Sequence, residues 1–197
     1  MDFFEPNRYF SRISAIDIPR DIIGRGYTHI LLDVDNTILT RDKHEIPHDV
    51  SLWLQNARKA GLEFCLISNN WHKGVYEWAN RLDMPIVAKA IKPLPPAIMF
   101  AMRKIGAQRK STLVIGDQLM TDVLGAHLLG IRAYMVCPLV EHDLKHTLLL
   151  RNIERFLMGD LLPEGSGYDD AGVEGIVEHS TYRGASTDES SQVMENG

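Results

Sequence analysis

Short apolar runs alternate with amphipathic segments along residues 29–136, and this alternation limits the fold more than any other feature of the chain. Runs such as Ile30–Leu32 are typical of strands that are buried on both faces, whereas apolar residues spaced three and four apart are typical of helices with one buried face. Strands that alternate with helices predict βαβ units and a parallel sheet. We therefore expect an α/β fold built on a Rossmann-like, doubly wound parallel sheet.

The alternation defines nine expected elements. Strands are expected at His29–Val34, Leu62–Ile67, Met84–Ala88, Thr112–Ile115 and Ala133–Val136. Helices are expected at Asp49–Ala60, Gly74–Leu82, Pro95–Ile105 and Met120–Leu129. A glycine follows three of these helices, at positions 61, 106 and 130, as is common at helix C-termini. A chain of this length can form one domain with a substantial core.

The acidity of the chain lies in its last segment. The full chain has a net charge of −5, but residues 163–197 carry −7 and residues 1–162 carry +2. The last segment has too few apolar side chains to offset the entropy lost when a chain becomes ordered. We therefore expect a folded domain at residues 1–162 and an acidic disordered tail at residues 163–197. This charge distribution does not identify a partner for the folded domain, and we expect no nucleic-acid partner.

Composition also excludes several classes of protein. Two cysteines are too few for a disulfide scaffold or a cysteine-based zinc module. The longest apolar runs fall far short of the roughly 18 to 20 residues that a membrane-spanning helix needs. The first residues include the acids Asp2 and Glu5, where a secretory signal has a basic region and an apolar stretch. We therefore expect a cytoplasmic protein.

Polar clusters follow four of the expected strands. They comprise Asp33–Asn36, Ser68–Asn70, Lys92 and Gly116–Gln118. In open parallel sheets, ligands bind beyond the carboxyl ends of the strands. Because these clusters all follow strands, the sequence predicts that they meet at one edge of the sheet and form a site there.

Two of the acids are only two residues apart. Asp33 and Asp35 would repel each other and lose hydration at the end of a buried strand unless a cation lay between them. A hard divalent ion with oxygen ligands meets that need, and Mg²⁺ suits it best when a phosphate completes the coordination. Taken alone, the pair is equally compatible with a solvated acidic loop.

The other clusters supply groups that suit a phosphate. The hydroxyl of Ser68 and the amide of Asn69 can donate hydrogen bonds to phosphate oxygens. Lys92 precedes a predicted helix and can neutralise an anion. Asp117 and Asp122 add two carboxylates of the kind that bind metals.

These clusters resemble, in order, the four motifs of the haloacid dehalogenase-like (HAD) superfamily of phosphatases. The resemblance spans about residues 27–136. It implies a HAD-like hydrolase fold and a phosphatase that depends on Mg²⁺. It also implies that Asp33 is the nucleophile, which forms an aspartyl-phosphate, and that Asp35 is the general acid and base. Thr37, just past these acids, matches a residue that shapes the loop.

The resemblance also assigns the remaining motif residues. Ser68 and Lys92 match the groups that hold the transferring phosphoryl group. Asp33, the main-chain carbonyl of Asp35 and Asp117 match the metal contacts. Asp122 matches a carboxylate that supports the waters of the metal and the lysine.

The spacing between the motifs leaves no room for a cap domain. HAD enzymes that select small metabolites usually insert such a domain after the first motif or between the second and third. Here residues 38–49 and 69–91 fill those two intervals, and neither is long enough for a folded cap. The chain thus resembles the capless subfamily IIIA, whose substrates are often large or presented by a surface.

Within the capless phosphatases, the sequence is most similar to the phosphatidylglycerophosphate phosphatase branch. Asn36 after Asp35 and Gln118 after Asp117 are the features that favour this branch. The resemblance implies a phospholipid head group as substrate and peripheral contact with the inner face of the membrane. Other readings stay open, namely a phosphatase of a soluble sugar phosphate, nucleotide or phosphoprotein, and an inactive binding module on the same fold.

Two segments could provide the membrane contact. One is Lys145–Leu161, which has apolar residues at helical spacing with basic residues around them. The other is the N-terminal group of Phe3, Phe4, Tyr9, Phe10 and Ile13. The alternative for both is that they pack on the sheet or on a second subunit.

Overall fold

The computed structural model describes residues 3–41, 43–71, 73–140 and 161–165. Within these residues, one sheet has six parallel strands in the order β1-β6-β5-β2-β3-β4. The strands are β1 (Arg8–Phe10), β2 (His29–Asp33), β3 (Glu63–Ile67), β4 (Ile86–Val87), β5 (Thr112–Gly116) and β6 (Arg132–Val136). β2 pairs with β3 on one side and with β5 on the other, so the chain adds strands in both directions from β2. This confirms the expected doubly wound sheet.

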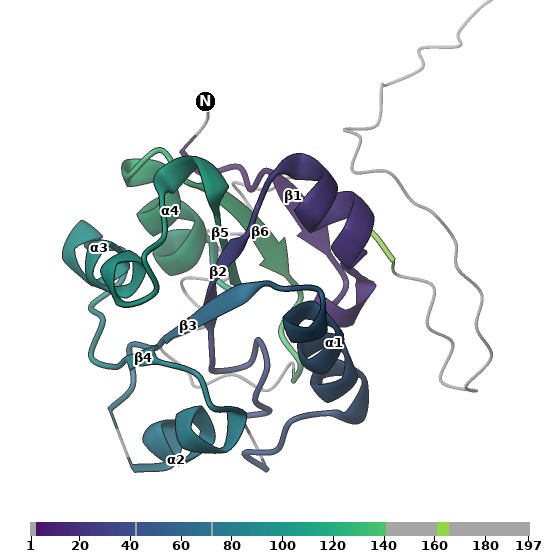
Figure 1. The fold of residues 1–197 in the computed structure, drawn as a ribbon, viewed down its shortest axis with the longest axis vertical. Coiled ribbons are helices and arrows are strands. Elements are labelled where there is room, and N and C mark those ends of the chain that lie inside the picture. The colour runs from purple at the N-terminus through teal and green to yellow at the C-terminus, as the bar shows by residue number, and fades with distance from the viewer. Residues whose placement is uncertain (1–2, 42, 72, 141–160, 166–197) are drawn as a thin grey trace, which may run out of the picture.

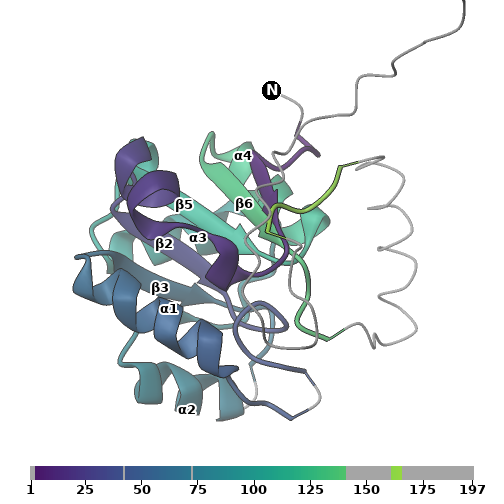
Figure 2. The ribbon, with the colours of Figure 1, turned by 90° about the vertical axis from the view of Figure 1, so that its right-hand side faces the viewer.

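Helices cover both faces of the sheet. The α-helices of the described residues are α1 (His48–Lys59), α2 (Lys73–Leu82), α3 (Pro95–Lys104) and α4 (Leu124–Leu128). Shorter helical turns lie at Ile13–Ala15, Ile18–Ile22, Ile23–Arg25, Arg109–Ser111 and Leu119–Val123. Figures 1 and 2 show α1 and α3 on opposite sides of the sheet. In the described residues no separate cap domain adjoins this layer structure.

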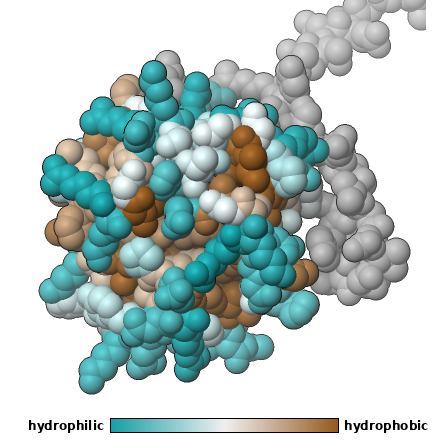
Figure 3. Space-filling view, viewed as in Figure 1, coloured by the Kyte–Doolittle hydropathy of each residue, from teal (hydrophilic) through white to brown (hydrophobic). Residues whose placement is uncertain are grey.

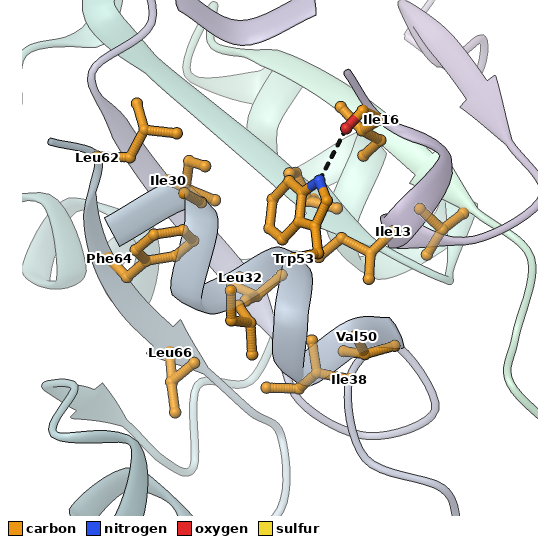
Figure 4. Close-up of a cluster of buried hydrophobic side chains, with 14 of the residues drawn as sticks. Ile13, Ile16, Ile30, Leu32, Ile38, Val50, Trp53, Leu62, Phe64 and Leu66 are labelled. Atoms are coloured by element: carbon orange, nitrogen blue, oxygen red, sulfur yellow. Dashed lines mark hydrogen bonds between the residues drawn. The ribbon is translucent and has the colours of Figure 1, made fainter. Parts of the chain in front are cut away.

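The core on the α1 side joins the N-terminal turns to the sheet. The indole of Trp53 on α1 donates a hydrogen bond of 2.8 Å to the carbonyl of Ile16, and its ring meets that of Phe64 edge-on with centroids 6.3 Å apart. Figure 4 shows Trp53 between these residues, with Ile30 and Leu32 of β2 in the same cluster. Burying apolar side chains of this size contributes about 1.5 to 3 kcal/mol each.

A second core fills the opposite face. Leu31 of β2, Cys65 of β3 and Val114 of β5 pack there against Ile98 of α3 and Ala126 of α4. Because neighbouring residues of β2 enter different cores, the strand is apolar throughout rather than alternating. This arrangement explains the short apolar runs of the sequence.

Besides the short helical turns, which were not predicted, some elements differ from those expected. β1 was not predicted, because a three-residue strand that begins with an arginine has no apolar pattern. The helix predicted over Met120–Leu129 forms, but its first part is a π-helical turn in which the amide of Val123 donates to the carbonyl of Gln118. The strand predicted over Met84–Ala88 is limited to the two residues of β4.

The N-terminal apolar residues mostly pack on the sheet. Phe10 and Ile13 are buried in the core on the α1 side, and Phe4 and Tyr9 pack against the core on the opposite side. Phe3 alone of this group is exposed. The packing alternative is therefore confirmed for four of these five residues. The other candidate segment, Lys145–Leu161, lies outside the described residues except for its last residue.

The surface shows no large apolar area on the face seen in Figure 3, where apolar side chains form small patches between hydrophilic ones. Among the described residues, no helix has the length and apolar character required to cross a membrane.

Residues 161–165 return to the open edge of β1, as Figure 2 shows. Glu164 pairs with the backbone on both sides of Phe10 through hydrogen bonds of 2.8 Å with Tyr9 and Ser11. The guanidinium of Arg8, the first residue of β1, binds the carboxylate of Glu164. The segment thus covers an edge that would otherwise expose unpaired backbone groups.

Candidate active site

The register of the sheet brings three of the predicted site residues to one place. Asp33, the last residue of β2, lies opposite Ile67 of β3. On the other side, Leu32 lies opposite Ile115 of β5, so that Asp33 is level with Gly116. The next residues of those strands, Ser68 and Asp117, therefore flank Asp33 at the carboxyl edge. This is the point where the strand order reverses, which is where open α/β sheets bind ligands.

Lys92 forms the centre of the site. Its side chain is buried, and its ammonium donates hydrogen bonds to the carboxylate of Asp33, to the carboxylate of Asp122 at 2.6 Å and to the carbonyl of Ile67 at 3.4 Å. One cation thus joins carboxylates from two of the sequence motifs. Burial alone would lower the pKa of Lys92, but Asp122 and Asp33 outweigh it and raise this pKa.

The loop that carries Lys92 is held by the neighbouring loop after β3. The side-chain oxygen of Asn69 accepts the amide N–H of Lys92 at 2.7 Å, and the side-chain nitrogen donates to the carbonyl of Lys92 at 3.4 Å. The amide of Ala90 also donates to the carbonyl of Ser68 at 3.1 Å. The two loops therefore form one unit, in which Asn69 holds the main chain of Lys92.

Asp33 is buried and surrounded by charge. Its second carboxylate oxygen accepts the hydroxyl of Thr37 at 3.1 Å. Burial raises the pKa of Asp33 to about 7; Lys92 opposes the shift, and the nearby carboxylates of Asp122 and Asp35 add to it. The position therefore favours a bound cation when Asp33 is ionised.

Asp35 lies at the more open side of the site. Its side chain accepts the hydroxyl of Ser68 at 2.8 Å, and that hydroxyl in turn accepts the amide of Asn70 at 2.9 Å. Ser68 is fully buried, whereas Asp35 is partly exposed. Asp35 can therefore meet a solvent molecule, while its orientation is held by Ser68.

Asp122 occupies a space that only a glycine leaves free. A Cβ on Gly116 would overlap the carboxylate of Asp122. The amide of Gln118 donates to one oxygen of this carboxylate at 3.2 Å, and Lys92 binds the other. Both oxygens of Asp122 are thus used to hold Lys92 and the turn after β5.

Three buried carboxylates could hold a metal ion. Ligand oxygens of Asp33, Asp117 and Asp122 all lie within 4.8 Å of one another. A set of oxygen ligands with excess negative charge is what hard divalent cations such as Mg²⁺ bind. The residues present therefore fit a divalent metal site.

The structure brings together all of the site residues that the sequence predicted. Among them, Asn69 contacts the main chain of Lys92 through both its side-chain oxygen and its side-chain nitrogen. Sequence reasoning missed the contacts of Asn36, which binds the backbone of residues 139 and 140. The available signal was an asparagine directly after the acidic pair, because asparagine adopts a positive φ more readily than most residues.

Comparison with known proteins gives the following matches. Residues 90–138 match the family model described as HAD-hydrolase-like. "Probable phosphatase YqeG" of Bacillus subtilis (strain 168) is 30% identical over 163 residues, covering 83% of this chain and 94% of that protein.

Solved structures with a similar fold include two bacterial proteins of low sequence identity. The cobalt-bound deoxy-D-mannose-octulosonate 8-phosphate phosphatase of Haemophilus influenzae superposes with a TM-score of 0.46 and 12% identity, covering 68% of this chain and 88% of that chain. An uncharacterized protein from Listeria monocytogenes serotype 4b superposes with a TM-score of 0.47 and 16% identity, covering 64% of this chain and 99% of that chain.

Proposed function

Because this chain belongs to the HAD-like hydrolase family and is a HAD-type phosphatase, we propose that it hydrolyses phosphate monoesters with Mg²⁺ through an aspartyl-phosphate on Asp33. The observation that carries the proposal is the buried group of Asp33, Lys92, Asp117 and Asp122. It combines a candidate nucleophile, a cation for the phosphoryl group and ligands for a metal in one place.

The first step is an in-line displacement at phosphorus. A carboxylate oxygen of Asp33 forms a bond to phosphorus while the bond from phosphorus to the alcohol oxygen breaks, and Asp35 gives its proton to the departing alkoxide. The hydroxyl of Ser68 and the ammonium of Lys92 hold oxygens of the transferring group. A magnesium ion bound by Asp33, Asp117 and the main chain of Asp35 would supply further charge neutralisation.

The second step regenerates the enzyme. Asp35, now ionised, takes a proton from water, and the oxygen of that water bonds to phosphorus as the bond to Asp33 breaks. Inorganic phosphate leaves. The partial exposure of Asp35 supports this role, because the same group must meet both the alcohol and water.

Hydrolysis of a generic aryl phosphate tests the proposal. We expect turnover with Mg²⁺ that chelation abolishes and that re-addition of Mg²⁺ restores. Asp33→Asn should lower kcat by at least about 1,000-fold without loss of the fold, because the nucleophile is absent. Asp83→Asn is the matched control, since Asp83 is an exposed carboxylate that pairs with Arg58. Full activity of the Asp33→Asn variant would refute the covalent scheme.

We propose phosphatidylglycerophosphate as the substrate, met from the cytoplasm by peripheral contact with the inner face of the membrane. Exposed apolar side chains on the loops that carry Ser68 and Lys92 support this. Trp71 is 63% exposed, Ile91 is 66% exposed and Leu94 is 53% exposed. Together with the ammonium of Lys89, 3.8 Å from the centre of the Trp71 ring, they suit an interface between apolar chains and anionic head groups.

A substrate panel tests this narrower proposal. Phosphatidylglycerophosphate in mixed micelles should give a higher kcat/KM than sugar phosphates, nucleotides and a phosphopeptide. Co-sedimentation with anionic vesicles should be stronger than with neutral ones. A preference for any of the soluble substrates would support the alternative of a soluble-substrate phosphatase, and would leave the magnesium-dependent mechanism intact.

A further inference from the structure

Asn36, the residue after Asp35, is fully buried and has a φ of 65°. Its side-chain nitrogen donates to the carbonyl of Val140 at 3.0 Å, and its side-chain oxygen accepts the amide of Val140 at 3.0 Å. Its main-chain carbonyl accepts the amide of Leu139 at 2.9 Å, and its main-chain amide donates to the carbonyl of Leu39 at 2.8 Å. Each of its four polar atoms is therefore hydrogen-bonded.

The residues that Asn36 binds are themselves held in place. They follow β6, where the amide of Cys137 donates to the carbonyl of Phe10 in β1 at 2.9 Å. The side chain of Leu139 packs against the core on the α1 side. β6 is separated from β2 by β5, so Asn36 reaches past a neighbouring strand to a fixed part of the molecule.

The contact of Asn36 affects how the neighbouring Asp35 is held. Asp35 must present its carboxyl group to the reacting oxygen, and it lies on the loop just past the end of β2. The loop leaves the sheet after Asp33, and the backbone of Asp35 forms only an isolated bridge with Leu39. The hydroxyl of Ser68 holds one side of Asp35, and Asn36 is the next residue along the chain that is fixed to the fold.

The side chain required here is specific. A glycine would adopt the positive φ but would lack both hydrogen bonds to Val140. An aspartate would keep the acceptor, but it would place a second acceptor opposite the carbonyl of Val140. Asparagine alone among common residues combines tolerance of this backbone conformation with a donor and an acceptor of the same length.

We propose that Asn36 is a positioning residue for catalysis, which holds Asp35 in reach of the reacting oxygen by fixing the loop to the backbone of Val140. The proposal rests on the proposed function, because Asp35 is its point of action. The backbone of residues 139 and 140 then forms part of the active-site assembly, although it carries no catalytic group.

A double-mutant cycle tests the proposal. Asn36→Gly removes the side chain while retaining the backbone conformation. Val140→Pro acts on the other partner, because it removes the amide N–H of residue 140 that donates to Asn36. We expect each variant to lower kcat about 10- to 100-fold with little change in KM, as misplacement of a catalytic group by about 1 Å does. The double variant should be no slower than the slower single variant, since both remove the same contact.

Three measurements make the outcome unambiguous. Unfolding curves give the folded fraction of each variant at the assay temperature, so that kcat is referred to folded protein. Asp83→Gly is the control for replacing a polar residue at positive φ, because Asp83 has a φ of 51° and is exposed, and its kcat should be unchanged. In the NMR spectrum, the side-chain amide of Asn36 should exchange slowly with solvent in wild type and faster in Val140→Pro, where only its bond to the carbonyl of residue 140 can remain.

Each contrary result has a distinct meaning. A kcat within about twofold of wild type for Asn36→Gly overturns the positioning role, as does a loss explained entirely by unfolded protein. An unchanged kcat for Val140→Pro overturns the part assigned to the backbone. If wild type itself lacks magnesium-dependent phosphatase activity, the proposed function fails first and the positioning role fails with it.

Discussion

The carboxylate of Asp122 lies in the space that a Cβ on Gly116 would fill. This relationship explains why a glycine ends β5 directly before the acidic turn. Because Asp122 also holds the ammonium of Lys92 at 2.6 Å, the packing at Gly116 controls the position of a charge that the proposed reaction uses.

Replacement of Gly116 by alanine should therefore disable the site. The new methyl group would displace the Asp122 carboxylate, and Lys92 would lose one of its two anionic partners. We expect kcat for aryl phosphate hydrolysis to fall about 100-fold or more. Gly106→Ala is the matched control: its backbone has a φ of 63° with open space around the new methyl, so it should cost about 1 to 2 kcal/mol of stability and leave kcat unchanged. Equal kcat values for the two variants would contradict the steric explanation.

The raised pKa of Asp33 predicts a stability change with pH in the metal-free protein. Burial raises this pKa from 3.8 to about 7, in spite of Lys92. A carboxyl whose pKa is higher in the folded than in the unfolded state favours folding at low pH, and this contribution is lost as the pH rises from about 4 through about 7. Asp33→Asn removes the titration. The variant should thus become more stable than wild type at pH 8, by up to about 4 kcal/mol at 1.36 kcal/mol per pKa unit.

Urea unfolding in the presence of chelator measures this difference. The difference between the two stabilities should narrow as the pH falls from 8 to 5 and close near pH 4. A difference between the two proteins that stays constant over this range would show that Asp33 does not titrate there.

Magnesium should stabilise the folded protein through the same carboxylates. At a concentration of 100 times Kd, a ligand that binds only the folded state adds about 2.7 kcal/mol. We expect Mg²⁺ to raise the Tm of wild type, and we expect Asp117→Asn to abolish the rise because one ligand is lost. Differential scanning calorimetry at constant ionic strength measures both. A similar rise in the two proteins would place the metal away from Asp117.

The site was more predictable than the contacts that support it. The apolar runs identify β2, β3 and β5, and the parallel register then places Asp33, Ser68 and Asp117 side by side. By contrast, the partner of Asn36 is the backbone of Val140, 104 residues away, and backbone atoms have no sequence signature. The position of Lys92 was inferred from its motif, but the bonds from Asn69 that hold it depend on two loops meeting.

The edge of the sheet was unpredictable for a related reason. β1 is only three residues long, and its stability comes from distant charges. Arg8 binds both Asp21, at 2.5 Å, and Glu164. These residues lie in three separate parts of the chain, and none belongs to a periodic pattern. Charge pairs of this kind are recognised only after the fold has brought them together.

This ion cluster predicts sensitivity to acid. Burial would raise the pKa of Asp21, but hydrogen bonds from Arg20 and Arg8 outweigh it and lower the pKa below 3.8. The stability that Asp21 contributes is therefore complete above the unfolded pKa and is lost as the pH falls through the lower, folded value. Asp21→Asn should cost about 3 to 5 kcal/mol at pH 7, because it leaves the Arg8 charge partly uncompensated.

Thermal unfolding from pH 7 to pH 2.5 tests this. The deficit of Asp21→Asn relative to wild type should narrow at the acid end. Asp83→Asn, which removes an exposed pair with Arg58, should change stability by less than about 0.5 kcal/mol at every pH. A deficit for Asp21→Asn that persists at pH 2.5 would assign it to packing and not to charge.

Replacement of Ile91 by glycine should change stability and activity in opposite directions. It has a φ of 52°, which is costly for a β-branched residue, yet 66% of its surface is exposed. Strain of this kind costs about 1 to 3 kcal/mol and persists where function requires it. Ile91→Gly should therefore stabilise the protein by about 1 kcal/mol, since few contacts are lost and the backbone strain is relieved.

The same variant should lose activity selectively if Ile91 meets the apolar part of a lipid substrate. We expect kcat/KM for phosphatidylglycerophosphate in mixed micelles to fall at least about fivefold, while kcat/KM for an aryl phosphate stays within about twofold of wild type. Leu94→Ser is the comparison variant, because it alters an exposed side chain on the same loop without a change in backbone strain. Leu52→Gly would not serve, because Leu52 lies within α1. Leu94→Ser should reproduce the selective loss without the gain in stability. Equal losses on both substrates would instead mean that Ile91 supports Lys92 and has no part in choosing the substrate.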